Sequence, residues 1–138
     1  MVRAVTAYVR SLRPLSASRP PSPSGQAAFT AAGCGACHIP ALPDRNGEAV
    51  PLYSDLLLHD LGPALDDGVI QGTASGAEWR TTPLWGLGAR HRFLHDGRAT
   101  SVTAAILAHG GEAAGAAAGF RSMTPERRDV LLGFVGAL

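Results

Sequence analysis

The chain has 138 residues, with 12 basic and 11 acidic side chains and a formal net charge of +1. This length suits one small domain. The scattered basic residues exclude the continuous basic surface that nucleic-acid-binding proteins use to follow phosphates. The longest apolar run, near residues 130–138, is too short to span a membrane, and no signal peptide follows Met1.

The first dozen residues have the pattern of a short amphipathic helix. Val2, Val5 and Val9 recur at helical spacing. Residues 14–23 are rich in proline and serine, which is typical of an extended linker. We therefore expect residues 1–13 to form a helix of a preceding domain that this chain lacks. A packing helix of the same domain fits the pattern nearly as well.

A predicted helix capped by Ser24 comes next, and residues 34–38 then read CGACH. The two cysteines of this motif are the only ones in the chain. Two thiols separated by two residues can each add to a vinyl group of a haem, and the histidine that follows can bind the iron as its proximal ligand. The motif therefore predicts one covalently bound haem c, held by Cys34, Cys37 and His38.

The same two cysteines fit two other kinds of site less well. A thiol redox pair is expected at the start of a helix in a strand-rich context. Here glycine and alanine surround the pair, and no apolar strand precedes it. A structural zinc site needs a second pair of ligands at comparable spacing, and no second Cys-x-x-Cys follows.

The two segments after the motif are expected to be irregular. Residues 39–50 hold three turn-forming residues and predict a surface loop. Residues 52–62 combine an apolar patch with Asp55 and His59, polar groups that need partners if they are buried. These groups could hydrogen-bond around the haem or between domains, but we expect His59 to be satisfied within a tight turn.

Residues 78–88 contain both tryptophans of the chain, and their threonine, proline and glycine content disfavours a helix. We expect an extended segment that lines the haem. A guanidinium beside an indole suits a haem propionate, because its fork pairs with carboxylates while the ring covers the porphyrin. Arg80 and Trp85 are therefore candidate haem contacts. The alternative is that Arg80 packs on Trp79 at the surface.

Residues 93–98 predict a sharp turn, with Gly97 in a backbone conformation that other residues rarely adopt. His95 is a conceivable ligand of the iron. We expect it instead to stabilise this turn together with Asp96.

Residues 102–109 predict a helix that Thr100 or Ser101 caps, and on it Ile106 and His109 share the apolar face. A lone histidine on such a face is usually a satisfied core residue, but the predicted haem lacks a sixth ligand. His109 is therefore the candidate for that position, opposite His38. Met123 is the rival candidate, since it precedes the last predicted helix, where many single-haem cytochromes carry a methionine ligand.

Several segments together resemble the bacterial di-haem cytochrome c peroxidase superfamily, and within it the di-haem oxidoreductases often labelled thiol oxidoreductases. The resemblance covers roughly residues 24 to 138. The segments that carry it are residues 33–38 (GCGACH), 52–62, 80–86 (RTTPLWG), 94–98 (LHDGR) and 106–113 (ILAHGGEA).

The resemblance implies an all-α, cytochrome c-like haem domain with long irregular loops. It implies a protein of two such domains with one haem each, of which residues 24–138 resemble the C-terminal, electron-transfer domain. In this superfamily the distal ligand of that haem varies between Met, Tyr and His at the end of the helix after the His-Asp-Gly turn. His109 stands at this position.

We therefore expect a domain that transfers electrons within a di-haem oxidoreductase or peroxidase-like enzyme, with His38 and His109 as axial ligands. The catalytic haem would lie in an N-terminal haem domain or upstream chain, and a redox partner protein would exchange electrons with it. Haem c predicts a periplasmic location. The alternatives are an open sixth position that makes this haem itself a peroxidase, a single-haem electron carrier with Met123 as distal ligand, and a haem-free interaction domain.

Overall fold

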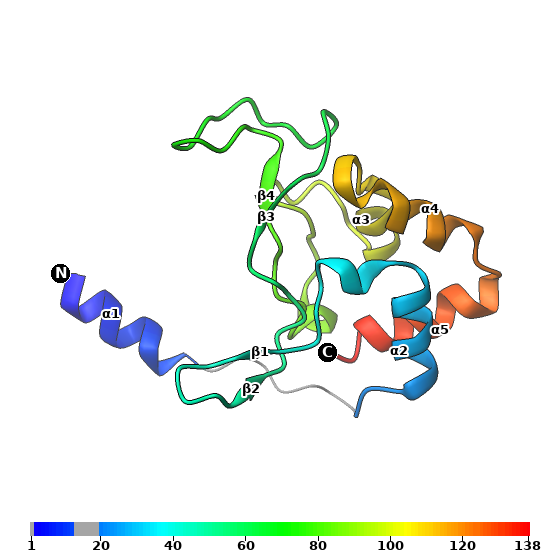
Figure 1. Ribbon diagram of the computed structural model, residues 1–138, viewed down its shortest axis with the longest axis horizontal. Coiled ribbons are helices and arrows are strands. Elements are labelled where there is room, and N and C mark those ends of the chain that lie inside the picture. Colours follow the sequence, from blue (N-terminus) through cyan, green and yellow to red (C-terminus); the bar gives the residue numbers. More distant parts are fainter. Residues whose placement is uncertain (1, 13–19) are drawn as a thin grey trace.

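The computed structural model describes residues 2–12 and 20–138 (Figure 1). The described chain forms five α-helices, namely α1 (Val2–Ser11), α2 (Pro23–Ala31), α3 (Val102–Ala108), α4 (Ala114–Ser122) and α5 (Pro125–Val135). It also forms three 3-10 helices, η1 (Cys34–Ala36), η2 (Leu87–Ala89) and η3 (Gly111–Ala113). Four short strands, β1 (Leu42–Pro43), β2 (Ala49–Val50), β3 (Leu58–Asp60) and β4 (Glu78–Arg80), pair as two antiparallel sheets.

The prediction of an all-α, cytochrome c-like domain with long irregular loops is wrong, because the fold is mixed. Residues 39–50, expected to be a loop, contain the β1–β2 pair. In the other sheet, β3 pairs with β4 in a register that places His59 opposite Trp79. Strands of two or three residues are too short to show the alternation by which a strand is recognised in a sequence.

The core lies between α2 and α5, which pack side by side (Figure 1). Phe29 on α2 and Phe134 on α5 are both 2 % exposed, and their ring centroids lie 5.5 Å apart. The ring of Tyr53 meets Phe29 edge-on at 6.0 Å. Burial of each such side chain stabilises the fold by about 1.5–3 kcal/mol. The motif at residues 34–38 packs against this cluster through Cys34 and His38.

Helix caps explain where the helices begin. α2 is capped by Ser22 rather than by the predicted Ser24, because Pro23 occupies the first helical position, where its missing N–H costs nothing. The Ser22 hydroxyl accepts the N–H of Gly25 at 3.0 Å. The predicted cap of α3 is confirmed, since Ser101 accepts the N–H of Ala104 at 3.0 Å.

The predicted N-terminal helix is confirmed as α1, which has no buried residue. It lies away from the other helices, and Val2 and Val5 on it are exposed (Figure 1). Of the predicted linker, residues 14–19 lie outside the described residues. Within residues 2–12 and 20–138, no helix has the length and apolar character that crossing a bilayer requires.

A close crossing of two backbones connects β3 to η3. Gly111 has a φ of 50°, and a β-carbon there would overlap the carbonyl oxygen of Asp60. Gly62, on the other backbone segment of the crossing, has a φ of 81° and lies against Gly111. Glycine is required where two chains approach this closely. The crossing brings the residues after α3 against the residues after β3.

Candidate functional site

The cysteine motif forms a tight turn between α2 and the rest of the chain. Gly33 has a φ of 89°, which lets the chain reverse direction directly after α2. Cys34 begins η1, and its carbonyl oxygen accepts the backbone N–H of His38 at 3.0 Å. Both thiols are free and half-buried. The turn therefore presents Cys34, Cys37 and His38 toward one space.

His38 is fixed in one tautomer by the backbone. Its Nδ1 lies 2.8 Å from the carbonyl oxygen of Tyr53, which can only accept, so Nδ1 carries the hydrogen and donates it. Burial lowers the pKa of His38, and the nearby His109 lowers it further. Neutral imidazole is the form that binds metals. The Nε2 lone pair of His38 is therefore available to a metal ion.

His109 is held in the same way from another element. It caps the C-terminal end of α3, and its Nδ1 donates to the carbonyl oxygen of Ala105 at 2.7 Å. When one ring nitrogen of a histidine donates such a hydrogen bond, the other ring nitrogen is the one that can bind a metal. Nε2 of His109 is thus the nitrogen that is left for a ligand.

Two adjoining cavities run along these histidines. The first has a volume of about 330 Å³ and the second about 210 Å³. Both cavities are lined by His38, Leu61, Trp79, Arg80 and His109. The first also contains Cys34 and Cys37 in its wall. The first volume reaches the lower end of the range of cofactor sites. The wall of this cavity holds the cysteine motif and both histidines.

The thiols do not have the character of a redox pair. Burial raises the pKa of Cys34 to about 11. The pKa of Cys37 is raised as well, by burial first and then by the carboxylates of Asp55 and Glu112. Reactive cysteines have lowered pKa values, because the thiolate is the nucleophile. This environment favours a structural use of the two sulfur atoms over thiol–disulfide exchange.

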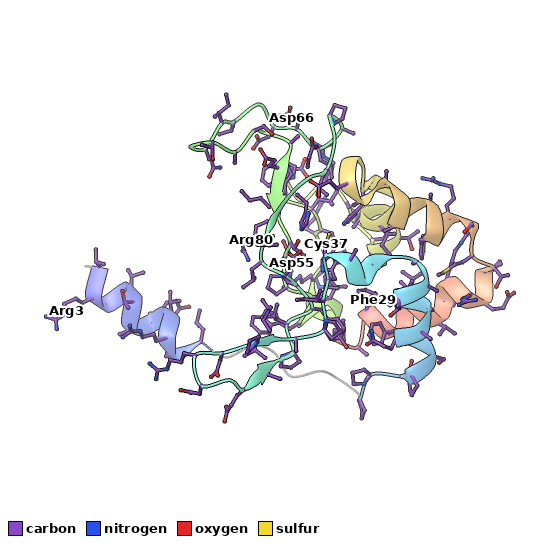
Figure 2. All side chains as sticks on the ribbon, viewed as in Figure 1. Arg3, Phe29, Cys37, Asp55, Asp66 and Arg80 are labelled. Carbon is purple, nitrogen blue, oxygen red and sulfur yellow. The ribbon has the colours of Figure 1, made fainter. Side chains whose placement is uncertain are left out.

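Arg80 lies at the cavities, and Trp85 does not. Arg80 on β4 is exposed and lines both hollows, with Cys37 and Asp55 close by in Figure 2. Trp85 is not among the described residues that line either one. Its carbonyl oxygen instead accepts a hydrogen bond from Arg90 at 3.2 Å.

Trp79 is the tryptophan that the sequence prediction missed. It lies opposite His59 in the β3–β4 register, and residues opposite one another in a ladder share a face of the sheet. Its Nε1 donates to the carbonyl oxygen of Leu65 at 3.0 Å, which fixes the indole at the cavity wall. The ring of His95 stacks on the indole, with the ring centroids 3.5 Å apart and an angle of 9° between the ring planes. Only the strand register could have distinguished Trp79 from Trp85.

The predicted turn at residues 93–98 is confirmed in its backbone, since Gly97 has a φ of 71°. The predicted partnership of His95 with Asp96 is present as an electrostatic interaction, but it is not the main contact of either residue. Asp96 pairs with Arg98, and the stack on Trp79 accounts for His95. His95 lines the second cavity.

Met123 caps α4 and packs against the core cluster of α2 and α5. It is not among the described residues that line either cavity. The structure thus brings His109 into the same hollow as His38, and it leaves Met123 outside.

His59 has two carboxylate partners rather than a place in a tight turn. Its Nε2 lies 2.9 Å from Oδ2 of Asp55, and its Nδ1 lies 2.9 Å from Oε2 of Glu112. Hydrogen bonds to Glu112 and then Asp55 raise the pKa of His59. The pKa of Glu112 is lowered, first by His59 and then by the N–H of Asp60. Two members of this triad, His59 and Glu112, line the first cavity.

Residues 6–138 match the model of a protein family described as "Di-haem oxidoreductase, putative peroxidase". The chain belongs to the di-haem oxidoreductase family. No curated protein and no solved structure was found to be significantly similar to it. Membership supports haem binding and oxidoreductase chemistry of the peroxidase-like kind.

The residues of this di-haem oxidoreductase fit a haem. The first cavity is lined by two thiols and three histidines, His38, His59 and His109. Two thiols and two of these histidines, His38 and His109, are the set that a covalently attached, doubly ligated haem requires. Each histidine has its Nδ1 engaged by a backbone carbonyl. The remaining wall is largely apolar, with Leu61 and Ile106 among its side chains.

Proposed function

We propose that this chain is an electron-transferring haem c domain of a di-haem oxidoreductase, with one haem held covalently by Cys34 and Cys37. His38 and His109 would hold its iron, each through Nε2. The observation that carries this proposal is the matched pair of backbone hydrogen bonds, Nδ1 of His38 to Tyr53 and Nδ1 of His109 to Ala105, on residues of the same cavities. The bound haem would supply reversible one-electron chemistry.

The protein's own residues bind the group, orient it and limit the access of water. The thioether positions and His38 lie within five residues, so attachment and ligation come from one rigid turn. His109 comes from the end of α3, more than seventy positions further along the chain. Ligation by both would therefore tie α3 to the cysteine motif and close the hollow between them.

Arg80 is the proposed partner of a haem propionate. Arg80 lines both cavities and is exposed. Trp79, rather than Trp85, is the proposed aromatic cover of the ring system, because its indole is fixed at the wall by the carbonyl oxygen of Leu65. Arg forks pair with carboxylates in two parallel hydrogen bonds.

The family and the number of attachment motifs support the proposed role in electron transfer. A di-haem oxidoreductase uses two haems, and this sequence contains one Cys-x-x-Cys-His. We infer that a second, reactive haem belongs to an N-terminal haem domain or upstream chain, and that this chain is the C-terminal domain. α1, with its exposed Val5 and Val9, is the proposed contact with that domain. Haem c attachment implies a periplasmic location, and a redox partner protein would complete the path.

The test is expression with an export leader and cytochrome c maturation machinery. We expect the mass of the chain plus one haem, and a colour that remains with the protein after acid-acetone extraction. The absorption spectrum should be that of six-coordinate, low-spin iron. A colourless protein of unmodified mass would contradict the covalent haem, and a high-spin spectrum would contradict the second axial ligand.

Peroxide turnover tests whether this haem only transfers electrons and the second haem reacts with peroxide. Two protein ligands leave no position on the iron for an oxygen-containing substrate, so the haem-loaded chain alone should reduce peroxide no faster than free haem. Steady-state peroxide reduction with a chemical electron donor measures this. Sustained turnover well above free haem would show that this haem is itself the reactive one.

A further inference from the structure

Three potential metal ligands, Cys37, Asp55 and His59, lie close together, and two of them, Cys37 and His59, line the first cavity. The Sγ of Cys37, a carboxylate oxygen of Asp55 and a ring nitrogen of His59 all lie within 4.8 Å of one another. The side chain of Asp55 is 12 % exposed and that of His59 is 18 % exposed. Thiolate, carboxylate and imidazole are the three ligand types that zinc takes from proteins.

The backbone fixes these ligands next to each other. The N–H of Asp55 donates to the carbonyl oxygen of Cys37 at 2.9 Å, so Asp55 is held beside the cysteine motif although it lies 18 positions further along the chain. Oδ1 of Asp55 accepts the N–H of Leu57 at 2.9 Å. Oδ2 of Asp55 therefore faces Nε2 of His59, at 2.9 Å.

A second layer of hydrogen bonds completes the arrangement. Nδ1 of His59 lies 2.9 Å from Oε2 of Glu112, and the other oxygen of Glu112 accepts the N–H of Asp60 at 2.9 Å. A histidine that binds a metal through one nitrogen commonly donates its other N–H to a carboxylate that is itself held in place. The contact of Glu112 with Nδ1 of His59 is an observation independent of the three ligand atoms. It leaves Nε2 of His59 for the metal.

We propose that the chain without haem binds one Zn²⁺ ion through Sγ of Cys37, a carboxylate oxygen of Asp55 and Nε2 of His59. The ion takes the place of the hydrogen between Asp55 and His59. Binding releases the thiol proton of Cys37 and the proton at Nε2 of His59. Three protein ligands leave a fourth position for water.

Haem attachment and this zinc site exclude each other, a consequence that rests on the proposed function. A thioether at Cys37 consumes the thiol that would become the zinc ligand. Zinc bound to the exported chain would therefore block attachment at Cys37, while Cys34 lies outside the cluster. The zinc site would therefore set the order of haem attachment, because zinc must dissociate before the thioether at Cys37 can form.

The test uses the full chain produced without haem attachment and kept reduced. Co²⁺ serves as the optical probe, because a cobalt ion bound by a thiolate shows a strong charge-transfer absorption, and Zn²⁺ then displaces it. We expect one equivalent to bind. Glu112→Gln should weaken metal binding by roughly 10- to 100-fold. Cys37→Ser and His59→Ala should each weaken it further. Cys37→Ser should also remove the thiolate band.

Cys34→Ser and His91→Ala are the matched controls, since each changes a residue of the same type outside the cluster. Both should keep the affinity and the band. Equal losses from Cys34→Ser and Cys37→Ser would overturn the proposal in favour of an ion held by the cysteine pair, and absence of binding to the reduced chain would overturn it altogether. The haem-loaded chain should show no thiolate band. A band there would refute only the mutual exclusion, whereas failure to load haem would refute the proposed function and leave the zinc result standing.

Discussion

His38 donates its Nδ1 hydrogen to the carbonyl oxygen of Tyr53, 2.8 Å away, and Tyr53 adopts a left-handed backbone with a φ of 52°. A residue other than glycine in this region costs about 1–3 kcal/mol and persists where its surroundings hold it. Here the Tyr53 hydroxyl donates to Oε1 of Gln26 at 3.0 Å, and the ring packs edge-on against Phe29. The core thus holds the carbonyl that orients the histidine.

The hydroxyl of Tyr53 can be removed without removing that carbonyl. We expect Tyr53→Phe to lower the free energy of unfolding by about 0.5–1.5 kcal/mol, because Gln26 loses its partner. The low-spin haem spectrum should not change. Denaturant unfolding of the haem-loaded chain measures the loss. Tyr8→Phe is the control, since Tyr8 is 64 % exposed on α1, and an equal loss there would contradict this account.

The axial ligands can be distinguished by a pair of substitutions. His109→Ala should convert the low-spin spectrum to high-spin, because the iron would lose its proposed sixth ligand. Met123→Leu should leave it low-spin, because Met123 packs in the core cluster and not at the cavity. Absorption spectra of the oxidised variants decide the matter. A methionine-to-iron charge-transfer band in the unmodified protein would reverse the assignment.

The packing of α5 against α2 predicts a large cost for one core truncation. Leu131 is 0 % exposed, so Leu131→Ala should lower the free energy of unfolding by about 2–5 kcal/mol through lost burial and the cavity it leaves. Leu57→Ala is the matched control, because Leu57 is 61 % exposed and should change stability by no more than about 0.5 kcal/mol. Similar losses in both variants would mean that the helix pair is not the core.

Features with local causes were predicted from the sequence, and features with distant partners were not. The motif at residues 34–38 carries its chemistry within five positions, and the Ser101 cap lies next to the helix it begins. The β3–β4 pair joins segments about twenty residues apart, and each strand has only three residues, so nothing in the sequence corrects the all-α fold that the family resemblance implies. The same pairing decides that Trp79, and not Trp85, faces the cavity.

The triad of His59 was missed for the same reason. Asp55 lies four positions from His59, which a sequence shows, but Glu112 lies 53 positions away. Nothing local to His59 indicates that second carboxylate. The crossing of Gly111 over Asp60 brings it there.

That crossing predicts the effect of a single methyl group. Gly111→Ala should lower the free energy of unfolding by at least about 1–3 kcal/mol, because alanine is strained at a φ of 50° and its β-carbon would overlap the carbonyl oxygen of Asp60. Gly133→Ala in α5 meets no atom and should instead stabilise by about 1 kcal/mol. Denaturant unfolding of both variants compares them directly. Stabilisation by both changes would show that the two backbones do not cross closely.

The charged triad predicts a window of pH in which it stabilises the fold. The pKa of His59 is raised above its ordinary 6.5 by Glu112 and Asp55. Its contribution is therefore complete below pH 6.5 and is lost as pH rises through the raised value. Burial alone would raise the pKa of Asp55, but the N–H of Leu57 and the ring of His59 outweigh it and lower the pKa below 3.8.

The pKa of Glu112 is also lowered, from 4.5, by His59 first. The carboxylate contributions are therefore present above their ordinary pKa values and are lost as pH falls through the lowered ones. The loss of stability on His59→Gln should be largest between about pH 4.5 and 6.5 and smaller on both sides. Unfolding free energies of the two proteins across pH measure this difference. In an Asp55→Asn, Glu112→Gln background the same change should show no such maximum, and a maximum that persists there would mean that His59 draws its stabilisation from other groups.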